Sequence, residues 1–237
     1  SRRRHTRYIS VTGVQTCALP IYPLNAPSRK IRLMLGEKRV SFAEKIVDPW
    51  TPDEALLSLN PAGEVPILVV DEGLTVCEAN AIVEYIDEAH GEPALIGKDA
   101  ASRAESRRLA AWFDNKFARE VTQHIAGEKL ERRVRANAAP DSRVLRAGRE
   151  NIQTHLQYIT WLVERRRWLA GDDLSVADLS AGAQLSLVDY SGDVPWDDHP
   201  AAKEWYVRLK SRPSFRPLLK DTLPGVPAAK VYADLDF

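Results

Sequence analysis

The hydrophobic pattern of this chain changes once, near residue 91, and this change limits the possible folds more than any other feature. Before it, segments with a helical period alternate with short strand-like runs. The run VPILVVD is rich in β-branched residues, and the Glu72-Gly73 pair after it is typical of a tight turn into a second strand. Helices are expected at residues 28–38, 52–60 and 78–90, and strands at residues 40–48, 65–71 and 74–77. Ser28 is the expected N-cap of the first helix. This order predicts a small mixed sheet covered by helices.

After residue 91 the strand-like runs stop. Residues 91–100 have the composition of a linker, and every later apolar stretch has helical spacing. Helices are expected at residues 103–130, 142–168, 175–190, 199–211 and 214–220, with a break at 138–141. The region 101–221 is therefore predicted to be all helical. Pro224 and Pro227 prevent a helix in residues 222–237, where we expect an extended tail.

The first 21 residues differ from the rest of the chain. They contain four arginines and no acidic residue, and they end in the run VTGVQTCALPI. A secretory signal is disfavoured because this run is too polar for an apolar signal core. The run instead resembles the translation of a sequencing-library adapter, so we interpret residues 1–21 as an artefactual segment. We expect the native first strand to survive only at residues 22–24, with residues 15–21 standing in for its beginning.

The composition argues against several classes of function. The 33 basic and 33 acidic residues balance, so no general attraction to nucleic acid or to membranes is expected. Cys17 and Cys77 are too few for a disulfide framework or a zinc site, and the five histidines lie without metal-ligand spacing. No apolar stretch reaches the length that spans a bilayer. These features predict a cytoplasmic protein without a metal site or membrane insertion.

Three motifs narrow the fold further: NPAGEVPILVV at residues 60–70, CEANAIVEYID at 77–87 and LSVADLSAG at 174–182. In the third motif, Ser175 and Asp178 have the spacing of a capping box, which would make this segment a folding motif. Together the motifs resemble those of the glutathione S-transferase family. The resemblance implies an α/β, thioredoxin-like N-terminal domain at residues 22–90 and an all-helical C-terminal domain at residues 101–221.

The same resemblance implies where glutathione would bind. The Val65–Pro66 bond would be cis, with the Val65 backbone against the cysteinyl part of the tripeptide. Glu78 and Ala79 would stand at the helix N-terminus that holds the γ-glutamyl carboxylate. The family usually has a serine where this chain has Ala79. Losing one hydrogen bond to a charged group weakens binding by about 1.5–3 kcal/mol.

A second departure from the family concerns the group that stabilises the glutathione thiolate. That position falls on Asn25, which can donate an N–H but cannot act as a nucleophile. Ser28 is the nearby hydroxyl that would substitute for it. We therefore expect a protein that binds a partner and uses no cofactor. The alternative is a glutathione-dependent transferase or isomerase that uses Asn25 or Ser28.

The chain ends in YADLDF, a short acidic and aromatic sequence of the kind found in linear recognition elements. The alternative is a tail that folds back over the domain surface. Trp50, in the loop sequence DPW, is either a packed loop aromatic or an exposed anchor for a partner. The candidate partner contacts are Trp50, Tyr232, Asp234, Leu235, Asp236 and Phe237.

This ending resembles that of a family of alphaproteobacterial cell-division proteins with the glutathione-transferase fold, as do PLNAPSRKIRLMLGEKR near the start and DPW. The resemblance implies a non-enzymatic homodimer that binds filaments of the tubulin-like protein FtsZ and regulates division. Such a protein would lie at the division site when bound to FtsZ. A stress-related adaptor with another partner is a further alternative.

Overall fold

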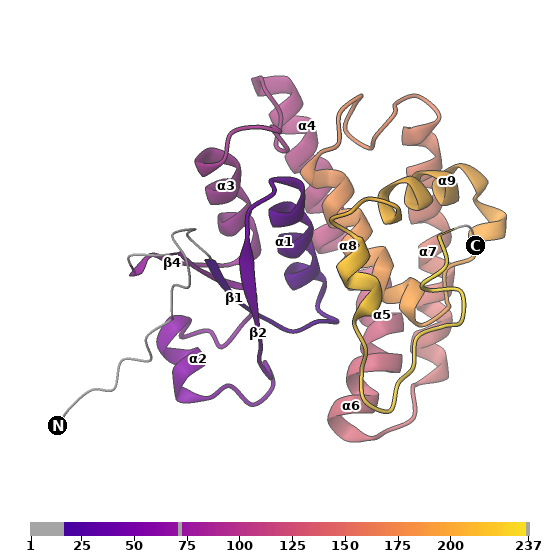
Figure 1. The fold of residues 1–237 in the computed structure, drawn as a ribbon. Helices are drawn as coiled ribbons and strands as arrows, with labels where there is room; N and C mark the ends of the chain where they lie inside the picture. The colour runs from indigo at the N-terminus through magenta and orange to yellow at the C-terminus, as the bar shows by residue number, and fades with distance from the viewer. Residues whose placement is uncertain (1–16, 71–72, 236–237) are drawn as a thin grey trace.

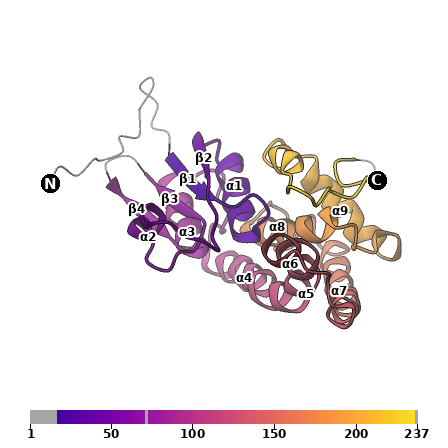
Figure 2. The same cartoon turned by 90° about the horizontal axis from the view of Figure 1, so that it is seen from below.

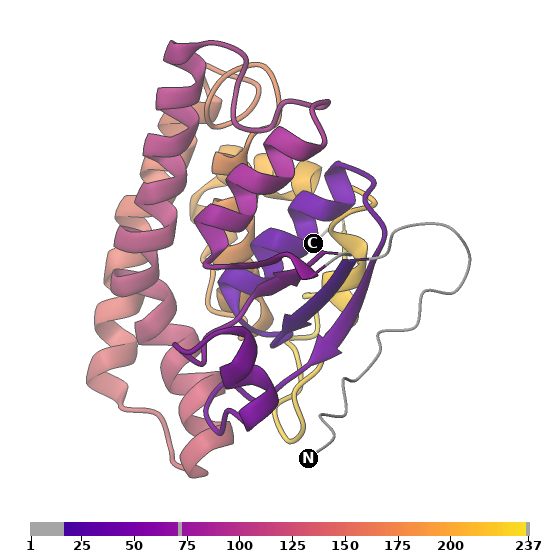
Figure 3. The ribbon, with the colours of Figure 1, turned by 90° about the vertical axis from the view of Figure 1, so that its left-hand side faces the viewer.

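The computed structural model describes residues 17–70 and 73–235 as a four-stranded sheet domain followed by a helical domain (Figure 1). The sheet has the order β2-β1-β3-β4; β1 is parallel to β2 and antiparallel to β3, and β3 is antiparallel to β4. Helices α1 and α3 pack side by side on one face of the sheet, and α2 lies on the other side (Figure 3). The elements of this domain are β1 Cys17–Ile21, α1 Ala26–Glu37, β2 Phe42–Ile46, α2 Glu54–Leu59, β3 Ile67–Val69, β4 Thr75–Cys77 and α3 Ala79–Ala89. This mixed sheet confirms the predicted thioredoxin-like domain.

Strand β1 lies in the interior of the sheet although its residues belong to the adapter-like run. Leu19 and Ile21 are fully buried, and all five residues of β1 pair with β2. Residues 17–21 thus take the place of the first strand, as expected. The expectation that residues 22–24 continue the strand is wrong, because Pro23 and Leu24 form the turn into α1. The remainder of the 1–21 segment lies outside the described residues.

The helical domain begins with one continuous helical run from Ala100 to Ala136 that includes two stretches of wider π-helical winding. It ends at Asn137, whose backbone is left-handed with φ of 46°. The elements are α4 Ala100–Ala111, η2 Trp112–Thr122, α5 Gln123–Ala126, η3 Gly127–Glu131, α6 Arg132–Ala136, α7 Ser142–Val163, α8 Val176–Tyr190, η4 Trp196–Asp198, α9 Pro200–Lys210 and η5 Arg216–Lys220. An all-helical second domain is therefore confirmed.

Three predicted helix bounds in this domain are wrong. The first helical run, expected to end at residue 130, continues to Ala136. The helix expected to reach residue 168 stops at Val163, because Trp168 instead forms a short bridge with Gly171. Residues 214–220 do not form an α-helix; only Arg216–Lys220 are helical, as a 3-10 turn. Pro217 lacks the N–H that an α-helix would use, so the tighter turn is favoured.

Helix α8 forms the centre of the molecule and packs against α1, α4 and η2. Every one of its residues is buried, and its small residues allow close approach. Ser175 and Asp178 form the expected capping box at its N-terminus. The Asp178 carboxylate also accepts hydrogen bonds from the Leu169 N–H and the Trp205 ring N–H, each at 2.9 Å. Burial nevertheless raises the pKa of this carboxyl.

Candidate functional site

Asn25 lies where β1 turns into α1, and its side chain caps the helix. Its Oδ1 accepts hydrogen bonds from the Ser28 N–H at 2.9 Å and from the Ser28 hydroxyl at 2.8 Å. The N-cap is therefore Asn25 and not Ser28 as predicted, because an amide oxygen three residues before the helix N3 amide satisfies an otherwise unpaired donor. Ser28 is fully buried and its hydroxyl proton is directed at Asn25. This geometry leaves Ser28 poorly placed to donate to a bound thiolate.

The Val65–Pro66 bond is cis, as the resemblance implied. The Val65 side chain is buried in a small cluster with Leu56 and Ile67, so the loop is supported by α2 and β3. Asn60 braces the same loop from within, since its amide donates to the Glu64 carbonyl at 3.0 Å. The loop whose backbone would face a cysteinyl group is therefore held in place by packing and by this hydrogen bond.

The N-terminus of α3 is occupied by a carboxylate of the chain itself. Glu78 Oε2 accepts from the backbone N–H groups of Asn80 at 3.0 Å and Ala81 at 3.1 Å. These amides belong to the helix N-terminus to which the resemblance assigned a γ-glutamyl carboxylate, and Ala79 adds no hydroxyl to them. Glu78 holds this position with a positive φ of 73°, which is uncommon for a residue other than glycine. A ligand carboxylate would have to displace that of Glu78.

Lys30 joins the two domains beside this helix terminus. It is 1% exposed, and its Nζ donates to Asn80 Oδ1 at 2.9 Å and to Asp114 Oδ2 at 2.6 Å. Ser180 on α8 donates to the same Asp114 oxygen at 3.2 Å. A cavity of about 220 Å³ lies next to this cluster between α1, α3 and the long helical run. Its basic groups, Lys30 and Arg107, are both paired with carboxylates, so this cavity carries little net charge.

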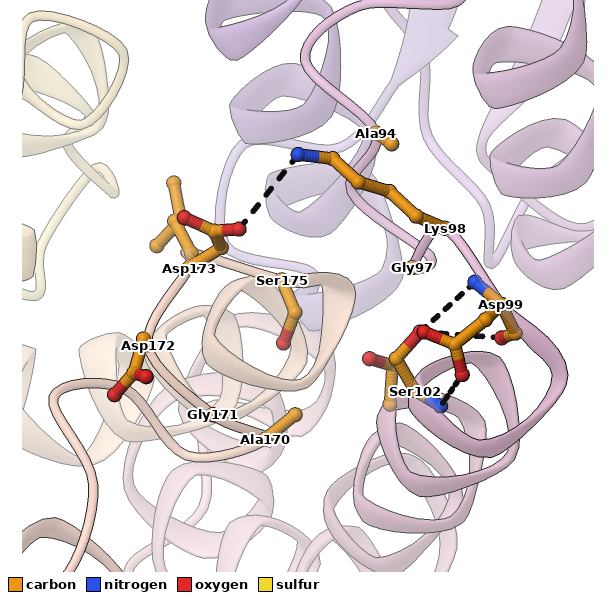
Figure 4. A pocket seen from close by; sticks show the side chains of 12 residues that line it. Ala94, Gly97, Lys98, Asp99, Ser102, Ala170, Gly171, Asp172, Asp173 and Ser175 are labelled. Carbon is orange, nitrogen blue, oxygen red and sulfur yellow. Dashed lines mark hydrogen bonds and ion pairs between the residues drawn. The ribbon is translucent and has the colours of Figure 1, made fainter.

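A second hollow, of about 170 Å³, lies between the linker and the loop before α8 (Figure 4). Several of its polar side chains serve the fold: Asp99 and Ser102 cap α4, and Lys98 approaches Asp173 at 3.9 Å. Both members of that ion pair are mostly exposed, and such pairs contribute little stability. Among the described residues, we find no group of three or more His, Cys, Asp and Glu side chains that could hold a metal. The hollow shows no set of groups arranged for catalysis.

Trp50 combines both alternatives that the sequence left open. It is half-buried, its ring meets the Tyr22 ring edge-on at 4.8 Å, and the Arg135 guanidinium lies 5.6 Å from the ring centre. Trp50 therefore bridges the sheet domain and α6 while part of it remains accessible. Burial, with a smaller contribution from Asp48, raises the pKa of Tyr22 to about 12.

The C-terminal tail wraps over the helical domain and lies beside α9 (Figure 2). It is not straight: Leu223 and Val226 pair across a turn, and the Tyr190 hydroxyl donates to the Val226 carbonyl at 2.7 Å. Tyr232 is 1% exposed, which corrects its assignment as a direct partner contact. The burial follows from hydrogen bonds that satisfy its hydroxyl inside the domain.

Of the other predicted contacts in the tail, Asp234 is exposed and Leu235 is partly exposed, whereas Asp236 and Phe237 lie outside the described residues. The sequence did not reveal the role of Arg29, the α1 residue that donates a hydrogen bond to Tyr232. Its only signal is the basic sequence SRKIR within an apolar helix, and such residues are normally solvent-exposed.

Comparison with known proteins first shows the class of protein to which the chain belongs. Residues 27–89 match the glutathione S-transferase N-terminal domain family. The structure also resembles the crystal structure of a glutathione S-transferase from Rhodospirillum rubrum F11. The TM-score is 0.92 at 54% identity, covering 94% of this chain and 100% of the other. The fold is that of the glutathione S-transferases.

Two further relatives place the chain in a smaller family within this class. The chain is 50% identical over 219 residues to FtsZ-localized protein A of Caulobacter vibrioides, spanning 91% of this chain and 96% of that protein. The structure of FzlA from C. crescentus matches with a TM-score of 0.91 at 49% identity, over 94% of this chain and all of the other. This chain belongs to the family of FtsZ-localized protein A. None of the helices within the described residues has the length and apolarity to cross a membrane.

Proposed function

We propose that this protein binds FtsZ filaments in the bacterial cytoplasm and regulates cell division at the division site without catalysing a reaction. The observation that carries the proposal is the 50% identity to FtsZ-localized protein A, which extends over nearly the full length of both chains. Similarity of that extent includes both domains. It is therefore not explained by a shared fold alone.

The geometry of the ligand cleft supports a binding role over a catalytic one. The Glu78 carboxylate occupies the α3 amides, and the Asn25 and Ser28 side chains are bonded to each other. Ala79 removes a hydroxyl that would contact a charged group, which alone weakens binding by roughly tenfold to a hundredfold. A cleft with these three features should bind glutathione weakly. We therefore propose that the protein uses no cofactor.

The proposed contact surface consists of the accessible tail residues Asp234 and Leu235, the two residues after them, and Trp50. We further propose that the protein acts as a homodimer, since two such surfaces would allow one dimer to bridge neighbouring filaments. Bridging raises the effective concentration of the second contact, so filaments are joined even where each single contact is weak.

The test is co-sedimentation with FtsZ polymerised in GTP. The informative variant is truncated after Ala233, because this removes the last four residues and leaves the buried Tyr232 in place. Pelleting of the full-length chain that is lost on truncation supports the proposal. A folded full-length protein that stays in the supernatant with FtsZ filaments present contradicts it.

A second candidate function is a glutathione-dependent transferase or isomerase. It is favoured by the cis Val65–Pro66 loop and by the 54% identity to a structure described as a glutathione S-transferase. Binding of glutathione in a calorimeter, together with turnover of a chromogenic electrophile, would favour this candidate. Turnover that depends on Asn25, tested with Asn25→Ala, would establish it.

A further inference from the structure

The tail is attached to the sheet domain through a buried tyrosine. The Tyr232 hydroxyl accepts a hydrogen bond from Arg29 Nη1 at 3.0 Å and donates one to the Leu218 carbonyl at 3.2 Å. Its ring meets the Tyr190 ring edge-on at 5.2 Å, and the Lys210 ammonium lies 5.6 Å from its centre. Both the polar tip and the ring of Tyr232 are thus held.

Arg29, which donates a hydrogen bond to this hydroxyl, is itself held by several other hydrogen bonds. It is fully buried, and its guanidinium also donates to the Pro23 carbonyl at 2.8 Å and to the Ser186 hydroxyl at 2.7 Å. A further bond joins it to Asp221 Oδ2 at 3.1 Å. Because Asp221 lies directly before the tail and Tyr232 lies near its end, one side chain of α1 holds the segment at both ends.

The stretch between these two points is fastened to α8. The Tyr190 hydroxyl accepts from the Leu223 N–H at 3.2 Å, and the Tyr190 carbonyl accepts from the Ala229 N–H at 2.8 Å. Chain ends are commonly poorly ordered unless other residues hold them. Here Arg29, Tyr190 and Leu218 hold the tail by hydrogen bonds. On either side of Tyr232 the chain faces solvent: Val231 is 48% exposed, and Ala233 and Asp234 are exposed.

We propose that Tyr232 is a positioning residue for FtsZ binding, whose anchorage on Arg29 pre-orders the tail and presents Asp234 and Leu235 from a fixed point. This inference rests on the proposed function. The physical reason is that a binding element already ordered in the free protein loses less conformational entropy when it binds. A tail released from Arg29 would lose that conformational entropy each time it bound FtsZ.

The test compares Tyr232→Phe and Tyr232→Ala with the wild-type chain by two measurements. Hydrogen exchange of residues 222–235 in the free protein reports the anchorage, and co-sedimentation with FtsZ in GTP reports the consequence. Loss of the hydroxyl should raise exchange at Ala229 and weaken FtsZ binding by roughly fivefold, and Tyr232→Ala by at least about tenfold. Tyr158→Phe is the control, because it also removes a phenolic hydroxyl that accepts from an arginine, Arg108 at 3.0 Å, but one that lies outside the tail.

The outcomes separate the two proposals. If the wild-type chain pellets and both Tyr232 variants exchange faster yet pellet equally well, pre-ordering is wrong while FtsZ binding stands. If the wild-type chain does not pellet, the proposed function fails and the positioning role fails with it. A synthetic peptide of residues 222–237 gives an independent check, since it lacks Arg29. It should compete with the folded protein only at a concentration at least about tenfold higher, and equal potency would overturn the inference.

Discussion

The guanidinium of Arg29 and the hydroxyl of Tyr232 lie 203 positions apart in the chain and 3.0 Å apart in space, in a site that solvent does not reach. This contact links the first helix of the sheet domain to the tail. Asp221 and Ser186 complete the cluster, so both domains and the tail meet on one side chain.

Arg29→Met should destabilise the protein strongly. Removing one partner from a buried charged cluster leaves Asp221 paired with Arg32 alone among the described residues, and it deprives Ser186 and Tyr232 of the hydrogen bonds that Arg29 donates. Such a loss typically costs about 3–5 kcal/mol. The free energy of unfolding, measured with urea, checks this prediction. The control is Arg107→Met, which breaks the exposed pair with Glu84 and should cost less than about 1 kcal/mol. Equal losses in the two variants would show that the Arg29 cluster is not special.

His155 should make the stability of the protein sensitive to acid. The ring is fully buried; Trp112 donates to its Nδ1 at 3.1 Å, so Nε2 carries the proton shared with Glu120. Burial lowers the pKa of His155 below its ordinary value of 6.5, outweighing Glu120. The unfolded chain then binds the proton more readily, so stability is complete above 6.5 and falls as the pH drops toward the folded-state pKa.

His155→Gln removes that titration, so its unfolding free energy should depend less on pH than that of the wild-type chain between roughly pH 5 and 7. The pKa of His199 is also lowered by burial and is unchanged in the variant, so the difference between the two proteins isolates His155. Parallel pH profiles from urea denaturation would refute the assignment.

Gly182→Ala should destabilise the central helix. A Cβ at this position would overlap with Leu209 Cδ2, and Leu209 is fully buried, so a packed side chain must move. Overpacking of this kind costs typically about 1–3 kcal/mol. Gly127→Ala is the control, because the nearest atom there is 4.0 Å away and alanine favours a helix. Thermal unfolding should therefore shift downward for the first variant and slightly upward for the second.

Ala79→Ser should raise the affinity for glutathione by roughly tenfold, because it supplies a hydroxyl beside the α3 amides. Titration calorimetry measures the change. Ala81→Ser adds a hydroxyl on the same helix two residues further along, and it should leave the affinity unaltered. If Ala79→Ser gains nothing, the Glu78 carboxylate excludes the ligand whatever stands next to it.

Several local features could be predicted because neighbouring residues decide them. The capping box of Ser175 and Asp178 needs only their spacing of three residues, and it formed as expected. The cis bond at Val65–Pro66 followed from a family motif in the same way. The sequence predicts the first helix correctly, but it favours Ser28 as the N-cap, whereas the structure has Asn25 there. Both residue types are good N-caps, and the bend that orients Asn25 depends on β1 and its turn.

The sequence by itself determined the order of the elements, the change from a mixed sheet to helices, and the fold family, because hydrophobic period and short motifs are local properties. Only the tertiary structure decided that Arg29 is buried and that Tyr232 is an anchor within the fold and not an exposed contact. A charged residue in a helix is normally solvated, and its burial becomes favourable only when partners from distant segments satisfy its donors. Ser186, Asp221 and Tyr232 accept these hydrogen bonds. The residues next to Arg29 in the sequence give no indication of these partners.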